Sequence, residues 1–264
     1  ELSELIYFNN QLLSPDDRTG VLYHILSHGA KRTDGFDNDN SNNLIDFPRV
    51  AAKAVLADGP GDTAKGFKGE WMVIKDGDLI IGGHGKEFTN PYNGTDIKNT
   101  NPMWIKKLDA FGTVSHIDWS YQYNQLRQAV GAEYPGYLIH EAVLWSAIRR
   151  QWIFLPRRFS TIAYSDDTNE HLGWNVAIFA DERFEHISSH EIKLPKIGER
   201  GFSTAKFVPG SEEILVMAIR TVELEGINQL ESYMSVFNIE DGNVYMEETF
   251  IGDYKFEGLE FFPL

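Results

Sequence analysis

The chain has 264 residues, of which 42% are hydrophobic and 13% aromatic, and its formal net charge is −15. That acidity argues against nucleic-acid binding, which requires a basic surface, and the absence of cysteine excludes disulfides and cysteine-based zinc or nucleophile chemistry. No apolar run approaches the ~20 residues of a membrane span, so we predict a single domain over residues 1–264 with no membrane span in this chain.

A short element recurs along the chain: a polar residue heads an apolar strand, and a tight turn and a second strand follow. The equivalent positions are spaced by 66, 71, 63 and 53 residues and are occupied by Glu4, Glu70, Glu141, Thr204 and Glu257. Repeats of this kind are typical of β-propeller blades. The first strand of each blade lines the central channel, so we expect the polar heads to converge on one axis.

Hairpin patterns dominate the chain. We expect strand pairs at 71–74 with 79–81, 142–145 with 151–155, 206–208 with 214–219, and 233–237 with 244–246. The first pair is joined by Asp76-Gly77, a dipeptide favoured in tight hairpin turns. Sheet made mostly of hairpins is antiparallel, so the fold class is all-β.

Two segments interrupt this pattern. Over 118–130, Asp118 can cap a helix whose buried stripe, at helical spacing, is formed by Trp119, Tyr123, Leu126 and Val130. We expect one short helix there, packed on the body of the domain. Residues 27–46 are rich in Asp, Asn, Gly and Ser, a composition that predicts a solvated surface loop. Their Asp-x-Asp spacing resembles a calcium loop, but the Gly and the distal Glu are not at EF-hand positions.

The fifth copy of the element ends at Leu264 with only its innermost strand. Propellers commonly close their ring with strands from the N-terminal end of the chain. We therefore expect N-terminal closing strands to be missing upstream of Glu1, which leaves the last blade incomplete in this chain.

The heads of the innermost strands are candidate metal ligands, namely Ser3, Glu70, Glu141, Ser203 and Glu257. Three carboxylates converging in a channel repel one another unless they are neutralised. A hard cation with ~6–8 oxygen ligands neutralises them, and Ca²⁺ suits ligands drawn from several blades better than Mg²⁺. The alternative interpretation is that these glutamates are solvated blade edges.

Charged groups also follow the second strand of successive copies, at Asp16-Asp17-Arg18, Lys86-Glu87 and Arg157-Arg158. Cations beside carboxylates suit a phosphate substrate, because the cations hold its oxygens while a carboxylate orients water. The alternative is surface salt bridging. The histidines His84, His116, His140 and His171 show no pair at zinc-ligand spacing, and His140 is interpreted as a packed histidine.

The chain resembles the calcium-activated nucleotidase and salivary apyrase family along its whole length. The resemblance is carried by Asp16-Asp17-Arg18-Thr19-Gly20, Lys65-Gly66-Phe67-Lys68-Gly69-Glu70-Trp71, Pro135-Gly136-Tyr137-Leu138-Ile139-His140-Glu141, Phe154-Leu155-Pro156-Arg157-Arg158 and Tyr254-Lys255-Phe256-Glu257-Gly258. It implies a five-bladed β-propeller with a central cation tunnel that holds Ca²⁺. It also implies hydrolysis of nucleoside di- and triphosphates to monophosphate and phosphate, with the choice between ADP or ATP and UDP or GDP left open.

The resemblance also implies roles for individual residues. The calcium positions of the family fall on the same five strand heads, and Glu4 stands where the family has an aspartate. The substrate positions fall on Asp17, Arg18, Lys86, Glu87 and Arg157, with Arg158 adjacent. We assign Asp17 and Glu87 to positioning the water. The remaining four bind phosphate.

Trp104 and Tyr164 are candidates for stacking on the nucleobase, with a role as core aromatics as the alternative. The neutral Met103 before Trp104 favours ADP, because the vertebrate branch has an acidic residue there. The resemblance further implies a secreted protein, extracellular or in the lumen of the secretory pathway, and a monomer or weak homodimer. A non-enzymatic propeller that binds nucleotides or carbohydrates is the competing function.

Overall fold

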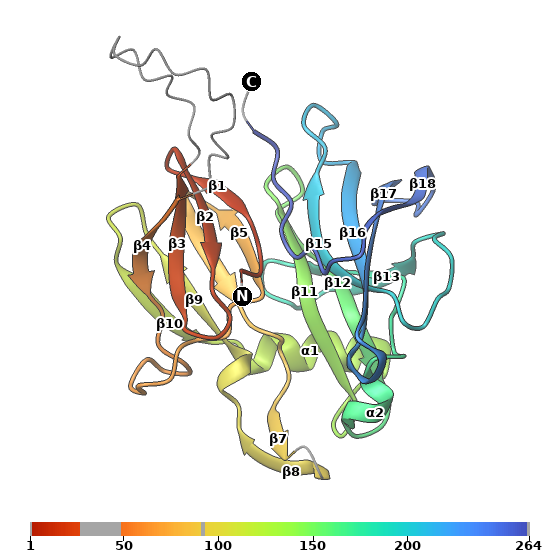
Figure 1. The fold of residues 1–264 in the computed structure, drawn as a ribbon, viewed down its shortest axis with the longest axis horizontal. Helices are drawn as coiled ribbons and strands as arrows, with labels where there is room; N and C mark the ends of the chain where they lie inside the picture. The colour runs from red at the N-terminus through yellow and green to blue at the C-terminus, as the bar shows by residue number, and fades with distance from the viewer. Residues whose placement is uncertain (1, 27–48, 91–92, 263–264) are drawn as a thin grey trace, which may run out of the picture.

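The structure, a computed structural model, describes residues 2–26, 49–90 and 93–262. Its described part contains four four-stranded antiparallel sheets arranged as propeller blades (Figure 1). Blade 1 contains β1 (Ile6–Phe8), β2 (Gln11–Pro15), β3 (Val21–Leu26) and β4 (Arg49–Val55). Blade 2 contains β5 (Trp71–Lys75), β6 (Asp78–Gly82), β9 (Trp104–Leu108) and β10 (Val114–Asp118).

Blade 3 contains β11 (Tyr137–Ser146), β12 (Gln151–Ser160), β13 (Val176–Asp181) and β14 (Ile187–Glu191). Blade 4 contains β15 (Gly201–Phe207), β16 (Leu215–Leu224), β17 (Gln229–Asn238) and β18 (Val244–Gly252). The first strands of the blades are neighbours, since β5 contacts β1 and β11, and β11 contacts β15. The all-β prediction is confirmed, and the four expected hairpins lie in blades 2, 3 and 4, with strands that are mostly longer than expected. The predicted loop at 27–46 lies outside the described residues.

The hairpin between β5 and β6 follows from its turn residues. Asp76 and Gly77 have φ angles of 53° and 87°, and Lys75 pairs with Asp78 across the turn. Positive φ at both central residues is the geometry of a two-residue turn that matches strand twist, and Asp-Gly adopts it readily. The register of the innermost hairpin of blade 2 is therefore set locally.

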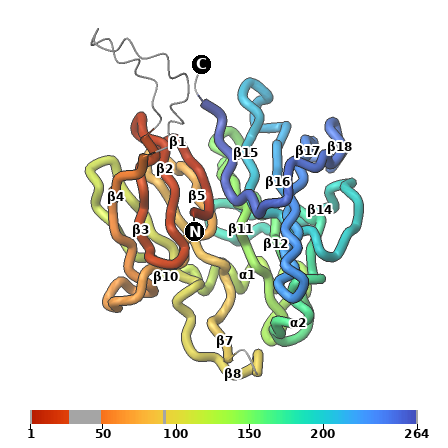
Figure 2. The backbone as a smooth tube through the Cα atoms, viewed as in Figure 1, coloured from red at the N-terminus to blue at the C-terminus, as the bar shows by residue number. Residues whose placement is uncertain are grey.

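A second hairpin is inserted in blade 2. It consists of β7 (Phe88–Asn90) and β8 (Asn93–Asn99), followed by the 3₁₀ turn η1 (Asn101–Met103). Strands β6 and β9 flank this insertion and still pair directly, with Gly82 opposite Ile105. The insertion therefore projects from the blade without interrupting its sheet, as the tube in Figure 2 shows.

The expected helix is confirmed as α1 (Ser120–Val130). The Asp118 carboxylate accepts the Ser120 backbone N–H at 2.8 Å, and Trp119, Tyr123 and Leu126 are buried in the core. The helix ends at Gly131, whose φ of 72° is a left-handed cap. The remaining helical turns are α2 (Asp166–Asn169) and η2 (Glu225–Ile227), and no helix among the described residues is long and apolar enough to cross a membrane.

The segment after β18 takes the place where the fifth copy of the repeat was expected. Residues 253–262 are not assigned to a strand, and they run between blade 4 and blade 1 (Figure 1). The Ser203 hydroxyl donates to the Phe256 carbonyl at 2.9 Å, and the Glu260 carboxylate accepts the Tyr7 backbone N–H at 2.8 Å. The described residues thus form four blades, and this segment bridges the first and the last of them.

Candidate active site and metal centre

Two β-bulges position Glu141 and Ser203. The β11–β12 register passes from His140 opposite Pro156 to Ala142 opposite Leu155, so Glu141 has no partner. The β15–β16 register shifts between Phe202 and Thr204, which leaves Ser203 unpaired. A bulge re-aims the side chain of its extra residue. Glu141 and Ser203 therefore lie within their strands rather than at the strand heads that the repeat predicted.

Glu70 and His84 lie together at the open end of the first hairpin of blade 2, where Trp71 pairs with Gly82. Glu70 immediately precedes β5, and His84 follows β6. The indole N–H of Trp71 donates to the Gly83 carbonyl at 3.0 Å, and the indole ring packs on Gly82, where a Cβ atom would lie only 1.9 Å from the ring. The His84 carbonyl accepts the His140 backbone N–H at 3.0 Å. Contacts to two blades thus fix the backbone that presents His84.

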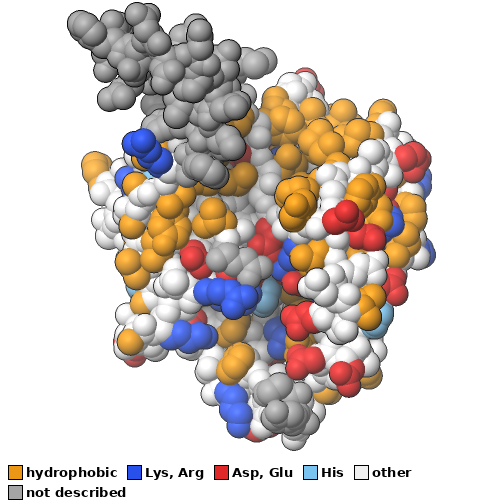
Figure 3. All heavy atoms as spheres, in the orientation of Figure 1, with side chains coloured by type: hydrophobic (Ala, Val, Ile, Leu, Met, Phe, Trp, Pro, Cys, Tyr) orange, Lys and Arg blue, Asp and Glu red, His pale blue; other side chains and the backbone are white. Residues whose placement is uncertain are grey.

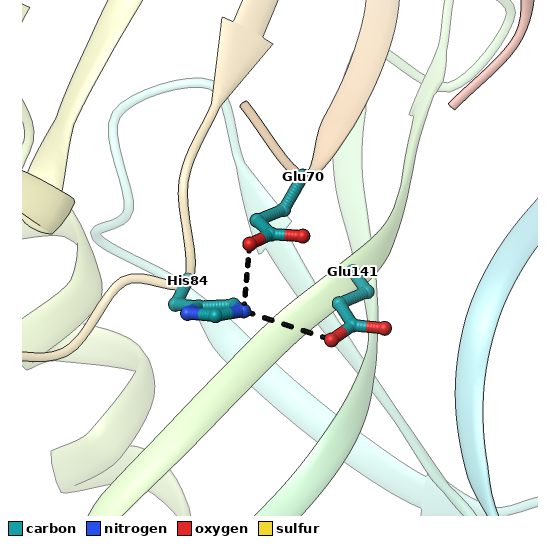
Figure 4. A group of neighbouring side chains, drawn as sticks. All are labelled: Glu70, His84 and Glu141. Carbon is teal, nitrogen blue, oxygen red and sulfur yellow. Dashed lines mark ion pairs between the residues drawn. The ribbon is translucent and has the colours of Figure 1, made fainter. Parts of the chain in front are cut away.

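Glu70, His84 and Glu141 form a compact cluster (Figure 4). His84 Nε2 lies 2.9 Å from Glu70 Oε1 and 3.6 Å from Glu141 Oε1. Burial opposes ionisation of the Glu70 carboxyl, but His84 and Lys68 outweigh it and hold its pKa below the ordinary value. Burial likewise opposes ionisation of Glu141, and Arg157 overcomes it and lowers the pKa. Both carboxylates are therefore ionised at neutral pH.

Of the other predicted metal ligands, Glu257 lies close enough to Glu141 and Glu70 to interact with their charges. Burial raises the pKa of Glu257 to about 7, against the opposing effect of Lys255, and the Glu141 charge raises it further. Ser3 Oγ is buried without a hydrogen-bond partner. Ser203 Oγ makes hydrogen bonds to the Ile219 and Phe256 carbonyls. Glu4 instead makes a separate buried contact, in which it accepts the Thr204 hydroxyl at 2.9 Å.

A cavity of about 800 Å³ opens beside the cluster. Figure 3 shows acidic, basic and histidine side chains gathered where this face is hollowed. Its walls include Glu141, His84 and all of the predicted phosphate-site residues, namely Asp17, Arg18, Lys86, Glu87, Arg157 and Arg158. Segments from all four described blades, including Glu223 of β16, and the strand-end charges of successive repeats therefore meet at one site.

Each carboxylate of the centre also has a cationic partner. Lys68 Nζ lies 2.6 Å from Glu70, Arg157 lies 2.8 Å from Glu141, and Lys255 lies 2.5 Å from Glu257. Arg157 is buried and also contacts Thr221 and Glu223. These contacts place Arg157 between the carboxylate cluster and the cavity.

Arg158 lies on the same strand in a different setting. Its Nε is buried without a hydrogen-bond partner, and one terminal nitrogen donates to the Glu199 carbonyl at 3.3 Å. Burial lowers the pKa of Arg158 to about 10, and the neighbouring Arg157 charge adds to the effect. A buried guanidinium with an unmet donor at a cavity wall is well suited to an anionic ligand.

The two predicted catalytic carboxylates differ in their surroundings. Glu87 accepts two hydrogen bonds from the buried Arg127, at 2.8 and 2.9 Å, so its oxygens are held by that guanidinium. Asp17 pairs with Lys68 through Oδ2, while its buried Oδ1 has no hydrogen-bond partner. Asp17 therefore has an unmet acceptor, whereas both Glu87 oxygens are engaged by Arg127.

The aromatic predictions have different outcomes. Tyr164 lines the cavity, and Lys86 Nζ lies 4.1 Å from the centre of its ring. Trp104 is not among the lining residues. Met103 is only 1% exposed and belongs to the hydrophobic core, so the argument that linked it to ADP does not hold.

Sequence reasoning missed several residues of the site. His84, Lys68, Lys255, Phe88 and Glu223 all line the cavity. In the sequence, His84 has no partner at metal-ligand spacing. The signal that points to it is the glycine-rich segment Gly82-Gly83-His84-Gly85, which indicates backbone packed too closely for larger side chains. The packed reading of His140 is confirmed, since the ring is buried and stacked on Tyr123.

The described part of the chain is thus an all-β protein with propeller-like blades, a polar cavity, and clustered carboxylates beside buried arginines. A family model described as Apyrase matches residues 1–262. The chain belongs to the apyrase family.

Individual relatives are similar over nearly the whole chain. The chain is 42% identical to "Apyrase apy-1" of Caenorhabditis elegans over 99% of its own length and 67% of that protein. It is 40% identical to "Apyrase" of Cimex lectularius, again over 99% of this chain and 65% of the relative. It is 40% identical to "Soluble calcium-activated nucleotidase 1" of Mus musculus over 99% of this chain and 58% of the relative. The chain thus spans about three fifths to two thirds of these relatives.

A solved structure, titled as a hypothetical selenium-binding protein from Sulfolobus tokodaii, aligns with 94% of this chain and 50% of that chain. The TM-score is 0.40 and the identity is 12%.

Proposed function

We propose that this protein hydrolyses nucleoside di- and triphosphates to the monophosphate and phosphate in a calcium-dependent reaction. The observation that carries the proposal is the joining, in one cavity, of a buried carboxylate cluster and several buried or half-buried cations. The names of the relatives support it, because they include apyrases and a calcium-activated nucleotidase. ADP, ATP, UDP and GDP remain the candidate substrates.

Glu70, Glu141 and Glu257 are the anionic ligands that would hold calcium, with Ser3 and Ser203 as neutral oxygen donors. These ligand atoms fit a hard cation, because all of them are oxygens. Ser3 Oγ is buried and has no hydrogen-bond partner, so it is available to a cation. Calcium supplies positive charge that offsets the charge of the phosphates. Calcium also ties together segments from different blades.

The phosphate-binding role falls to Arg18, Lys86, Arg157 and Arg158. Arg158 has the unmet donor, and Arg157 is anchored by Glu141 and Glu223. Burial lowers the pKa of Lys86 to about 8, so an approaching phosphate would favour its protonated form. These cations neutralise the non-bridging oxygens and hold the terminal phosphorus for attack.

We assign the water-orienting role to Asp17, whose buried Oδ1 has no other partner. The water oxygen attacks the terminal phosphorus while the phosphoanhydride oxygen leaves, and Asp17 accepts a hydrogen bond from the attacking water. Glu87 acts through the Lys86 loop, because Arg127 holds both of its oxygens. Tyr164 and Phe88, both on the cavity wall, are the aromatic rings proposed to contact the base, in preference to Trp104.

We also propose that residues 253–262 are the innermost strand of a fifth blade and that the blades enclose a central cation tunnel. Their contacts to Ser203 on one side and Tyr7 on the other support this. Slow amide exchange over these residues would agree with a strand. Exchange as fast as in an unpaired loop would contradict it.

The relatives also lead us to propose a secreted protein, extracellular or in the secretory pathway. Asn93 lies in an Asn-Gly-Thr sequon and is exposed. Expression in secreting cells should yield protein in the medium that loses mass on deglycosylation, and Thr95→Ala should remove that loss.

Phosphate release from a panel of nucleotides tests the function. Release from at least one nucleoside diphosphate with Ca²⁺, lost with a chelator and restored by excess Ca²⁺, is expected. Nucleotide binding without turnover would favour the non-enzymatic alternative.

A further inference from the structure

We propose that Glu70, His84 and Glu141 form a binding site for a transition-metal ion, with Zn²⁺ as the representative, and that this ion competes with calcium for the two carboxylates. The site is chosen from the ligand atoms themselves. One nitrogen and two oxygens, each from a different segment of the chain, lie within 4.8 Å of one another.

The distances between these atoms match a small coordination sphere. Zinc binds nitrogen and oxygen at about 2.0–2.2 Å in tetrahedral sites, which places neighbouring ligand atoms about 3.3–3.6 Å apart. His84 Nε2 lies 2.9 Å from Glu70 Oε1 and 3.6 Å from Glu141 Oε1. The two distances to Nε2 are thus already close to those of a zinc site, and the two carboxylate oxygens lie within 4.8 Å of each other. Figure 4 shows Nε2 directed between the two carboxylates.

The imidazole nitrogen is what distinguishes this site from a calcium site. Calcium takes oxygen ligands almost alone, whereas imidazole suits zinc, copper, iron and nickel. Calcium would use Glu70 and Glu141 without needing His84, and a transition metal would use all three. His84 is therefore the residue that selects between the two kinds of ion.

The surroundings leave the ligand atoms accessible. Arg157 holds Glu141 through Oε2, so Oε1 faces His84. Lys68 contacts Glu70 Oε1, but its side chain is 47% exposed and has room to move into the cavity. His84 itself lines the cavity, and a metal held by three protein ligands would keep a fourth position open to it.

A second cluster offers a comparison within the same chain. Asp181, Glu185 and His186 also bring ligand atoms within 4.8 Å of one another, but on an exposed turn. Both Asp181 oxygens already accept backbone N–H groups of that turn, and the His186 side chain is 88% exposed. Its ligands are solvated and partly engaged, so His186 is the control rather than the proposal.

Co²⁺ is the probe, because a histidine-ligated, four-coordinate cobalt ion absorbs visible light and calcium does not. The wild-type protein is expected to give this absorption at one equivalent of Co²⁺, and both Zn²⁺ and excess Ca²⁺ are expected to abolish it. His84→Gln should weaken Co²⁺ and Zn²⁺ binding, measured by calorimetry, at least about tenfold. His186→Gln should leave the absorption and its loss with Ca²⁺ unchanged.

Retained visible absorption in His84→Gln, or its loss in His186→Gln, overturns the proposal. So does wild-type absorption that calcium leaves unchanged while calcium binds elsewhere on the protein. Circular dichroism and the melting temperature check that His84→Gln folds. If it does not fold, Glu70→Gln takes its place and should lose the Co²⁺ absorption.

The competition experiment with Ca²⁺ rests on the proposed calcium function, whereas the Co²⁺ and Zn²⁺ titrations do not. Failure of the wild-type protein to bind calcium or to release phosphate would therefore sink the proposed function alone. The cobalt and zinc titrations would still decide the transition-metal site.

Discussion

At the scale of single residues, Glu141 connects the two halves of the site. One oxygen faces His84 and the other receives Arg157, which extends to Thr221 and Glu223. A single carboxylate thus belongs both to the metal cluster and to the wall that would bind phosphate. Its position on a bulge, with no cross-strand partner, allows one side chain to serve both.

Glu141→Gln should therefore impair two measurable properties. Calcium affinity should fall at least about tenfold, because one anionic ligand is lost and its neighbours are left less well oriented. Calcium-dependent phosphate release should fall with it. Calorimetry and a phosphate assay measure the two. Glu240→Gln, at an exposed ion pair with Arg149, is the control and should change neither.

Lys106 shows how burial controls charge away from the site. The side chain is fully buried, and its ammonium group contacts the Gly59 carbonyl and His116. Burial lowers the pKa of Lys106 from its ordinary value to about 8, with Asp58 opposing the shift. Between pH 8 and about 10.5 the unfolded chain binds more protons than the folded one. The free energy of unfolding therefore rises with pH in that window and falls as the pH drops through 8.

Lys106→Met should remove this dependence. The stability of the wild type relative to the variant should increase from pH 7.5 to 10 by an amount on the order of 2 kcal/mol. Urea unfolding at several pH values measures it. Lys107→Met, at the neighbouring half-exposed lysine paired with Asp78, should run parallel to the wild type. Parallel curves for Lys106→Met as well would refute the assignment.

At the scale of elements, the first hairpin of blade 2 determines where two metal-site residues lie. Trp71 follows Glu70 directly, and its ring packs on Gly82, two residues before His84. The hairpin register places Trp71 opposite Gly82, so the strand pairing itself brings the ring against Gly82. We therefore expect displacement of the indole to move the open end of the hairpin, which carries both Glu70 and His84.

Gly82→Ala should consequently destabilise the protein and loosen the metal site. The added methyl group would overlap the Trp71 ring in a packed core, a change that typically costs about 1–3 kcal/mol. The melting temperature and calcium affinity should both fall. Gly226→Ala, where nothing lies within 4 Å of the new methyl group, is the matched control. Unchanged calcium affinity in folded Gly82→Ala protein would disprove this coupling.

The inserted hairpin has a corresponding test. A methyl group at Gly94 would lie 2.1 Å from the Tyr164 carbonyl oxygen. Gly94→Ala should therefore displace Tyr164 and raise the KM for nucleotide several-fold while calcium affinity stays constant. Kinetics over a range of nucleotide concentrations, with Gly226→Ala as the reference, measure this. A lower kcat at unchanged KM would show that the hairpin does not act through substrate binding.

Local signals account for what the sequence predicted well. Asp76-Gly77 predicts the hairpin, and the stripe from Trp119 to Val130 predicts the helix, because both signals depend on neighbouring residues. The location of His84 beside Glu70 and Glu141 depends instead on strand register and on a bulge. Neither is visible in residue spacing, so the cluster was only half predicted. Met103 is a different case. The family resemblance placed it at the substrate, whereas packing places its side chain in the core.

At the scale of the whole molecule, the proposed metal centre draws on segments far apart in the chain. Glu70 precedes β5, Glu141 lies on β11, and Glu257 lies in the segment that bridges blades 4 and 1. A cation bound by all three would join these elements directly. Binding of such an ion to the folded chain alone stabilises the fold by mass action.

Calcium should therefore raise the melting temperature. At a free concentration of about 100 times Kd, the added stability is about 2.7 kcal/mol, which corresponds to about 5–10 °C for a chain of this size. Differential scanning calorimetry with Ca²⁺ and with a chelator measures it. Mg²⁺ at the same concentration is the control and should give a smaller shift. Equal melting temperatures in calcium and chelator would contradict the proposed site.

The insertion of β7 and β8 has a consequence for how this protein can diversify. Because Gly82 pairs directly with Ile105, everything between them leaves and rejoins the sheet at adjacent points, yet it supplies cavity residues such as Lys86 and Phe88. We therefore expect the β7–β8 part of this segment to accept exchange between relatives without loss of the sheet. A change of nucleotide preference on such an exchange would show that the hairpin contributes to substrate choice.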